Sequence, residues 1–173
     1  MRKISNNSLR QKHFDLEYNA LRNEILKRIE LRQQLIAISL TLAGAFLSVG
    51  LSTDLVVLIY PPLATFLALG WAQNDFRIRD LAKYIRDNLE SARTGLLYET
   101  YVQKTRKESK GLGAWRIVVF SHSGIFLFTQ LMAIGIELSK TKSLNFTPIK
   151  WSLLSIDLVA FLVVIWIAVQ SKR

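Results

Sequence analysis

Hydrophobic residues gather into four blocks along this chain, and polar and charged residues fill the segments between them. The blocks run from Leu35 to Leu51, Leu55 to Ala72, Ile117 to Ile136 and Trp151 to Val169, and Asp157 in the fourth is the one charged residue in them. Each block is about 17–20 residues long, or roughly 26–30 Å of α-helix, which matches the hydrocarbon core of a bilayer. The pattern predicts an all-α integral membrane protein with four transmembrane helices.

Other classes fit the pattern poorly. A soluble bundle would have to cover four helices that are apolar all round, and 173 residues offer too little covering surface. A signal peptide does not explain the first block, because 34 residues precede it and no small-residue cleavage site stands out after it. The chain has no Cys, which excludes disulfides and Cys-ligated metal sites.

No catalytic motif stands out either. The sequence contains no Gly-rich phosphate loop, no H-E-x-x-H and no G-x-S-x-G, and its two His leave few members for a catalytic triad or zinc site. We therefore expect no enzyme activity, no metal and no cofactor.

The charge sets the expected orientation. The net charge is +10 and the mean hydropathy is +0.23, and 20 of the 23 Lys and Arg residues fall before the first block, between the second and third, or after the fourth. By the positive-inside rule these segments face the cytoplasm of a bacterial inner membrane, so nucleic acid is not needed to explain the charge. The expected parts are a cytoplasmic amphipathic helix (1–34), a transmembrane hairpin (35–72), a cytoplasmic helical loop (73–114), a second transmembrane hairpin (115–170) and a cytoplasmic tail (171–173).

The tryptophans lie near the expected ends of the spans. Trp and Tyr favour the level of the lipid headgroups. Four residues are therefore expected to anchor the protein at the bilayer interfaces: Trp71, Trp115, Trp151 and Trp166.

Two apolar stripes at helical spacing precede the first span and follow the second. Because a very short outer turn joins these spans, the two cytoplasmic helices should emerge side by side and pack as an antiparallel pair. Apolar surface left over would suit a second copy of the chain or a cytoplasmic protein partner. The alternatives are binding to the membrane surface and a closed helical knob. The stripes are Tyr18, Leu21, Ile25 and Ile29, and Ile78, Leu81, Ile85 and Leu89.

Polar groups inside the spans are costly, and each is a candidate functional residue. Asp157, Gln130 and Tyr60 fall at similar depths in the outer half of the membrane, which predicts a polar cluster. The alternatives are a hydrogen bond between helices with no transport role and a pathway for chloride, protons or cations. His122 lies roughly 12 Å deeper along the membrane normal, so it should not pair with Asp157; it is either a pH sensor or a packed neutral side chain.

Pro61 and Pro62 follow Tyr60 within the second span. Each proline lacks an N–H, so we expect a bend that frees carbonyl groups near Val57 and Leu58.

The helix–span–span–helix layout of residues 8–93 resembles that of small bacterial membrane effectors called SLATT domains. The stretches Arg22–Arg32 (RNEILKRIELR) and Tyr60–Asp80 (YPPLATFLALGWAQNDFRIRD) are also similar to a group of small bacterial membrane proteins. The second hairpin, residues 115–170, departs from the two-span pattern, although related four-span effectors exist. The resemblance implies an oligomeric pore-forming or membrane-disrupting effector, gated by a cytoplasmic partner, in defence against phage.

The leading hypothesis is thus a self-associating membrane effector or channel-like subunit that receives a signal through its cytoplasmic helices. One alternative is a non-conducting anchor or scaffold for a cytoplasmic partner. Another is a small transporter that uses Asp157.

Overall fold

A computed structural model describes residues 6–53, 55–90, 98–108, 115–140 and 147–170, with side chains for all of these except residues 6–8, 10, 106–107 and 115–122. The described residues are helical almost throughout, and no strand occurs among them. The predicted all-α class is therefore confirmed.

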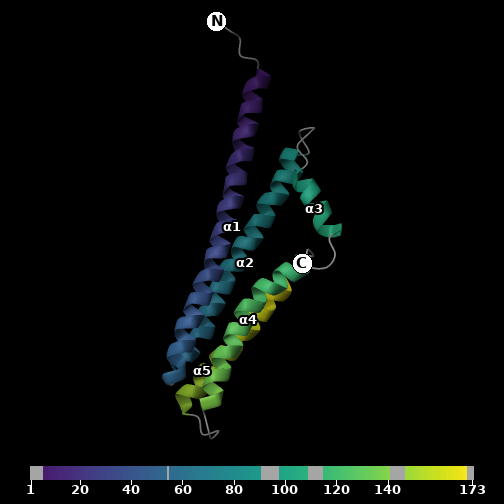
Figure 1. The fold of residues 1–173 in the computed structure, drawn as a ribbon. Helices are drawn as coiled ribbons and strands as arrows, with labels where there is room; N and C mark the ends of the chain where they lie inside the picture. The colour runs from purple at the N-terminus through teal and green to yellow at the C-terminus, as the bar shows by residue number, and fades with distance from the viewer. Residues whose placement is uncertain (1–5, 54, 91–97, 109–114, 141–146, 171–173) are drawn as a thin grey trace.

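The first helix, α1 (Asn6–Ser52), is a single unbroken helix of 47 residues. At 1.5 Å per residue it is about 70 Å long, more than twice the thickness of a hydrocarbon core. Figure 1 shows that its N-terminal half extends well beyond α4 and α5 and that its N-terminal end also passes the end of α2. One continuous helix thus carries both the polar N-terminal arm and the first apolar block.

The second apolar block begins with a tight turn rather than a regular helix. Leu55 has a φ of 70°, in the left-handed region that L-residues rarely adopt. The 3-10 helix η1 (Val56–Ile59) follows, and then α2 (Tyr60–Tyr84) begins. The chain continues through the π-helical segment η2 (Ile85–Glu90) without leaving the direction of α2.

The prolines therefore do not bend the middle of a span, and that expectation is corrected. Pro61 and Pro62 occupy the first turn of α2, where the missing N–H groups have no intrahelical partner to lose. The carbonyl of Val57 accepts a hydrogen bond from the Tyr60 N–H, so the 3-10 turn uses that carbonyl.

The remaining elements are α3 (Tyr98–Glu108), α4 (Trp115–Lys140) and α5 (Pro148–Gln170). Contacts between neighbours run α1–α2, α2–α5, α5–α4 and α4–α1, and α2 also meets α4 across the centre. These helices thus form a four-helix bundle, with the α1–α2 and α4–α5 turns at the same end (Figure 1). Beyond the bundle, the N-terminal half of α1, the end of α2 and η2 form an antiparallel pair, here called the stalk, and α3 lies against its side.

Apolar side chains fill three successive cores. The inner end of the bundle, next to the stalk, packs Ile36, Trp71 and Phe126 together with α5 residues. The end with the turns packs Val57, Leu58 and Tyr60 around Ala43 and Ala133. The stalk has a separate core, described below.

Three helices of the described chain are long and apolar enough to cross a membrane: Gln11–Ser52, Val56–Glu90 and Pro148–Gln170. Large apolar side chains also cover the outside of the bundle, as lipid contact requires. Phe66 on α2, Phe128 on α4 and Leu158 on α5 are each more than half exposed. The structure is consistent with a membrane protein.

Candidate functional site

The bundle interior holds a line of buried polar side chains. Tyr60 is fully buried, and its hydroxyl donates to Thr129 Oγ1 of α4 at 2.8 Å and lies 3.2 Å from Ser39 Oγ of α1. One side chain thus joins three helices by hydrogen bonds in an apolar setting, where each bond also avoids the cost of an unpaired polar group. Tyr60 therefore belongs to a network with Ser39 and Thr129.

Gln130 lies next along α4 and is also fully buried. Its Nε2 donates to the carbonyl of Pro61 at 3.1 Å and to Thr65 Oγ1 at 3.0 Å. Both N–H groups of the amide are used by α2, and Oε1 has no hydrogen-bond partner among the described residues. The side chain is held in one orientation with its acceptor oxygen free.

Asp157 faces the bundle interior from α5. It is fully buried, on the same face as Ala160, Val164 and Ile167. Neither carboxyl oxygen has a hydrogen-bond partner in the described part of the chain. An isolated ionised carboxylate in an apolar interior is among the most costly arrangements a protein can hold. Asp157 thus does not reach solvent along its helix.

The end of the bundle with the turns contains an ion pair that the sequence analysis missed. Glu137 of α4 is fully buried, and its Oε1 lies 2.7 Å from Lys150 Nζ of α5. Its Oε2 accepts a hydrogen bond from the Leu55 N–H at 3.4 Å, where the backbone is left-handed. Glu137 directly follows the third apolar block. It was missed because residues beyond the end of the block were expected to lie outside the membrane core.

Lys140 binds the end of α1. Its Nζ donates to the carbonyls of Gly50 and, at 2.8 Å, of Thr53. The last carbonyls of a helix have no intrahelical partner and carry partial negative charge, so a cation is favourable there. Together with Glu137 and Lys150, this contact ties the two hairpins to each other at their turns.

A second buried ion pair lies where the stalk meets the bundle. Asp75 of α2 is 1% exposed, and its Oδ1 lies 2.7 Å from Arg32 Nη1 of α1. Arg79, one turn later on α2, reaches Asp75 Oδ2 at 3.3 Å. The Asp75–Arg79 pair has the (i, i+4) spacing of a helix-surface pair, but the carboxylate is buried and its closest partner comes from α1.

The tryptophans divide into two kinds. Trp151 and Trp166 are more than half exposed on α5, as side chains that contact lipid headgroups would be. Trp71 is only 2% exposed and packs in the inner core, with the Arg32 guanidinium 5.9 Å from its ring centre. Its expected role as an interface anchor is corrected, because the ring faces α1 and the core rather than the bilayer. The side chains of Trp115 and His122 lie outside the described residues.

The two apolar stripes pack against each other in the stalk. Ile25, Ile85 and Leu89 form its buried centre, with Ile85 fully buried. The helices meet because α1 and α2 leave one short turn antiparallel and continue beyond the bundle. Around the centre lie the other stripe members, Tyr18, Leu21, Ile29, Ile78 and Leu81, with Phe14 and Ala82. The stripes leave little apolar surface of their own for an outside partner.

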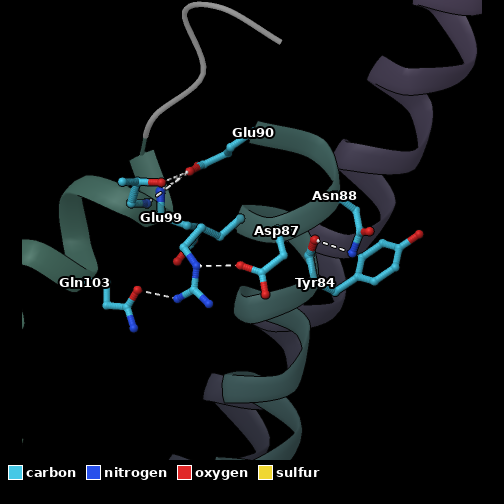
Figure 2. A network of polar contacts seen from close by, with 8 residues as sticks. Tyr84, Asp87, Asn88, Glu90, Glu99 and Gln103 are labelled. Carbon is cyan, nitrogen blue, oxygen red and sulfur yellow. Dashed lines mark hydrogen bonds and ion pairs between the residues drawn. The ribbon is translucent and has the colours of Figure 1, made fainter. Parts of the chain in front are cut away.

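Polar contacts fix α3 to the stalk. Glu90, at the end of η2, accepts the N–H groups of Glu99 at 2.6 Å and Thr100 at 3.0 Å, so its carboxylate caps the start of α3 (Figure 2). Glu99 itself pairs with Arg22 of α1. On the far side, Arg86 bonds both Asp87 and Gln103. Three separate contacts therefore hold α3 against both helices of the stalk.

Comparison of the chain with protein-family models, curated proteins and solved structures finds no match. The resemblance to SLATT-type effectors thus rests on the sequence layout alone.

Proposed function

We propose that this protein is a four-span, self-associating membrane effector or channel-like subunit whose stalk receives a cytoplasmic signal. The observation that carries the proposal is the unbroken α1, which belongs to both the stalk and the bundle. A rigid helix that spans both parts will transmit a displacement of the stalk to the membrane region, because no hinge interrupts it.

The contacts at the junction support this coupling. Arg32 and Asp75 join α1 to α2 where the stalk enters the bundle, and Arg28 Nη1 reaches Asn74 Oδ1 at 3.4 Å one turn away. Buried charge pairs tolerate few alternative geometries, since separating the partners leaves an unpaired charge. The two helices of the stalk would therefore move as a unit.

The fourth span is part of the proposal. α4 runs antiparallel to α5 beside it, and its Phe128 and Leu131 are more than half exposed on the outside of the bundle. Those side chains suit lipid. With four spans, the Lys and Arg distribution favours the stalk and both termini on the cytoplasmic side of a bacterial inner membrane.

The proposed effector role, in defence against phage, draws on the SLATT resemblance. Such a protein would act as an oligomer with a pore between copies, because side chains of the described residues fill the interior of the single bundle. Lipid and further copies of the chain are then its main partners, together with a cytoplasmic protein that binds the stalk outside the stripes, where Leu16 and Leu26 of α1 are exposed.

Membrane potential tests the proposal. Induced expression in bacteria should depolarise the cells, as a voltage-sensitive dye reports, and Ile85→Asp should abolish the effect because it places a charge in the stalk core. Lys83→Glu, at an exposed position two residues earlier at the end of α2, is the matched control and should depolarise like the wild type. All three chains must reach the membrane fraction in equal amounts.

The oligomeric state provides an independent check. Native mass spectrometry of the chain in nanodiscs should show a defined oligomer. Normal membrane potential together with a monomer would contradict the effector proposal and favour a non-conducting scaffold.

A further inference from the structure

Two buried acceptors on facing helices lie at the same level of the bundle. The Glu137–Lys150 pair sets the register between α4 and the antiparallel α5. Gln130 precedes Glu137 by seven residues and Asp157 follows Lys150 by seven residues. Seven residues are about two helical turns, so Gln130 and Asp157 face each other again roughly 10 Å deeper in the bundle.

Contacts with α2 independently place Gln130 near the stretch of α5 that carries Asp157. Thr65 Oγ1 accepts from Gln130 Nε2 and donates to the carbonyl of Ala160 at 3.2 Å. Ala160 lies three residues from Asp157 on the same buried face of α5. The two registers agree to within about one turn, which places the amide of Gln130 and the carboxyl of Asp157 near each other beside the first turns of α2.

At this level of the bundle, hydrogen-bond acceptors outnumber the available donors among the described residues. Gln130 Oε1 and both Asp157 carboxyl oxygens are acceptors, and all three are buried without a donor among the described residues. Gln130 cannot supply the donor, because both of its N–H groups are used by Pro61 and Thr65. An ionised carboxyl group is acceptor-only, whereas a protonated one gains an O–H donor.

We propose that Asp157 and Gln130 form a proton-binding site inside the bundle. The Asp157 carboxyl group carries the proton, and its O–H donates a hydrogen bond to Gln130 Oε1. A single proton removes the isolated charge and satisfies the amide oxygen at once. The inference does not depend on the effector role, since the site lies within one copy of the chain.

A proton suits the site better than a metal ion. Ca²⁺ takes six to eight oxygen ligands and Mg²⁺ an octahedral set. The described residues offer three free side-chain oxygens here, and the nearby carbonyls of Pro61 and Ala160 already accept hydrogen bonds. No described group of three or more His, Asp and Glu side chains could hold a metal.

The charged and titratable groups around the site lie at other levels or are committed to partners. Glu137 on α4 and Lys150 on α5 neutralise each other two turns away. The Tyr60 hydroxyl of α2 donates to Thr129. Towards the stalk, α1 presents Arg32 and α2 presents Asp75, which pair with each other. Position 122 of α4 is roughly 12 Å from Gln130 along the helix.

Infrared spectroscopy of the full chain in nanodiscs at neutral pH tests the site. The carbonyl stretch of a carboxylic acid should be present in the wild type and absent from Asp157→Asn. The same band should remain, at a shifted frequency, in Gln130→Leu, which removes the acceptor. Asp15→Asn, an exposed carboxyl of α1, is the control and should leave the band unchanged.

Loss of the band in Asp157→Asn must not result from unfolding, and the chosen substitution guards against that. Asn at position 157 has the shape of Asp and an N–H that can donate to Gln130, so Asp157→Asn should unfold at a temperature no lower than that of the wild type. An acid band that survives Asp157→Asn overturns the proposal. So does the absence of the band in the wild type. If in addition sodium raises the unfolding temperature of the wild type but not of Asp157→Asn, the ligand is a cation instead.

Discussion

Gly50 governs how closely α1 approaches the 3-10 turn that follows it. A Cβ added at Gly50 would lie 2.6 Å from Val57 Cβ, and Val57 is fully buried. Nearby, Lys140 binds the Gly50 carbonyl, so the backbone cannot easily shift to make room. The position needs a residue without a side chain for steric reasons.

We predict that Gly50→Ala lowers the free energy of unfolding by about 1–3 kcal/mol, the usual cost of overpacking a core. Gly44→Ala is the matched control on the same helix, because nothing lies within 4 Å of its added Cβ. That variant should be as stable as the wild type or up to about 1 kcal/mol more stable. Equal effects at the two sites, measured by unfolding in mixed micelles, would show that the turn is not tightly packed.

Asp75 is the residue on which the junction between stalk and bundle depends most. Replacing it with Ala leaves the Arg32 guanidinium, only 15% exposed, without its closest partner. We predict that Asp75→Ala costs about 3 kcal/mol of unfolding free energy, typical for breaking a buried ion pair. Asp80→Ala, an exposed carboxylate one turn later, should change stability by less than about 0.5 kcal/mol. A small loss at Asp75 would mean that Arg32 finds water or another acceptor.

Single-sequence reasoning located Asp157, Gln130 and Tyr60 but not their partners. A block of apolar residues was taken to end at or before the first charged residue. Glu137 and Asp75 lie just past such ends, so the sequence did not show that they are buried in the bundle. Their partners, Lys150 and Arg32, come from other helices and cannot be inferred from local spacing. The useful signal was the charge itself, within one turn of an apolar block.

At the scale of elements, the helical periods were sufficient to predict the stalk. Apolar residues at spacings of three and four defined both stripes, and a short turn between the spans required them to emerge together. The helix boundaries were harder, because α1 and α2 continue through the change from apolar to charged sequence. At the membrane surface the sequence changes from apolar to charged residues, but the helical backbone hydrogen bonds continue. A change in composition therefore does not show where a helix ends.

The docking of α3 depends on the cap that Glu90 provides. Glu90→Ala removes the acceptor for the N–H groups of Glu99 and Thr100. We predict that hydrogen exchange in the first turn of α3 becomes about fivefold faster, which corresponds to a loss of about 1 kcal/mol, as for a lost helix cap. Glu108→Ala, at the other end of α3 and exposed, should leave these amides unchanged. Unchanged exchange in Glu90→Ala would show that Arg22 and Arg86 hold α3 by themselves.

At the scale of the molecule, the bundle and the stalk share two helices but differ in what surrounds them. The bundle presents apolar side chains outward and keeps its polar groups inside, whereas the stalk has an apolar centre and a largely polar exterior that also exposes Leu16 and Leu26. This inversion is the expected consequence of lipid around one part and water around the other. The proposed function therefore depends on where the membrane lies along the helices.

Cysteine labelling in intact cells is the most direct test of that placement, because the chain has no Cys of its own. Single cysteines would replace Asp15 in the stalk, Thr53 after α1 and Thr147 before α5, all exposed. With four spans and a cytoplasmic stalk, a membrane-impermeant maleimide should label Thr53→Cys and Thr147→Cys in intact cells, and Asp15→Cys only after the membrane is opened. Labelling of Asp15→Cys in intact cells, or protection of Thr147→Cys, would contradict the account.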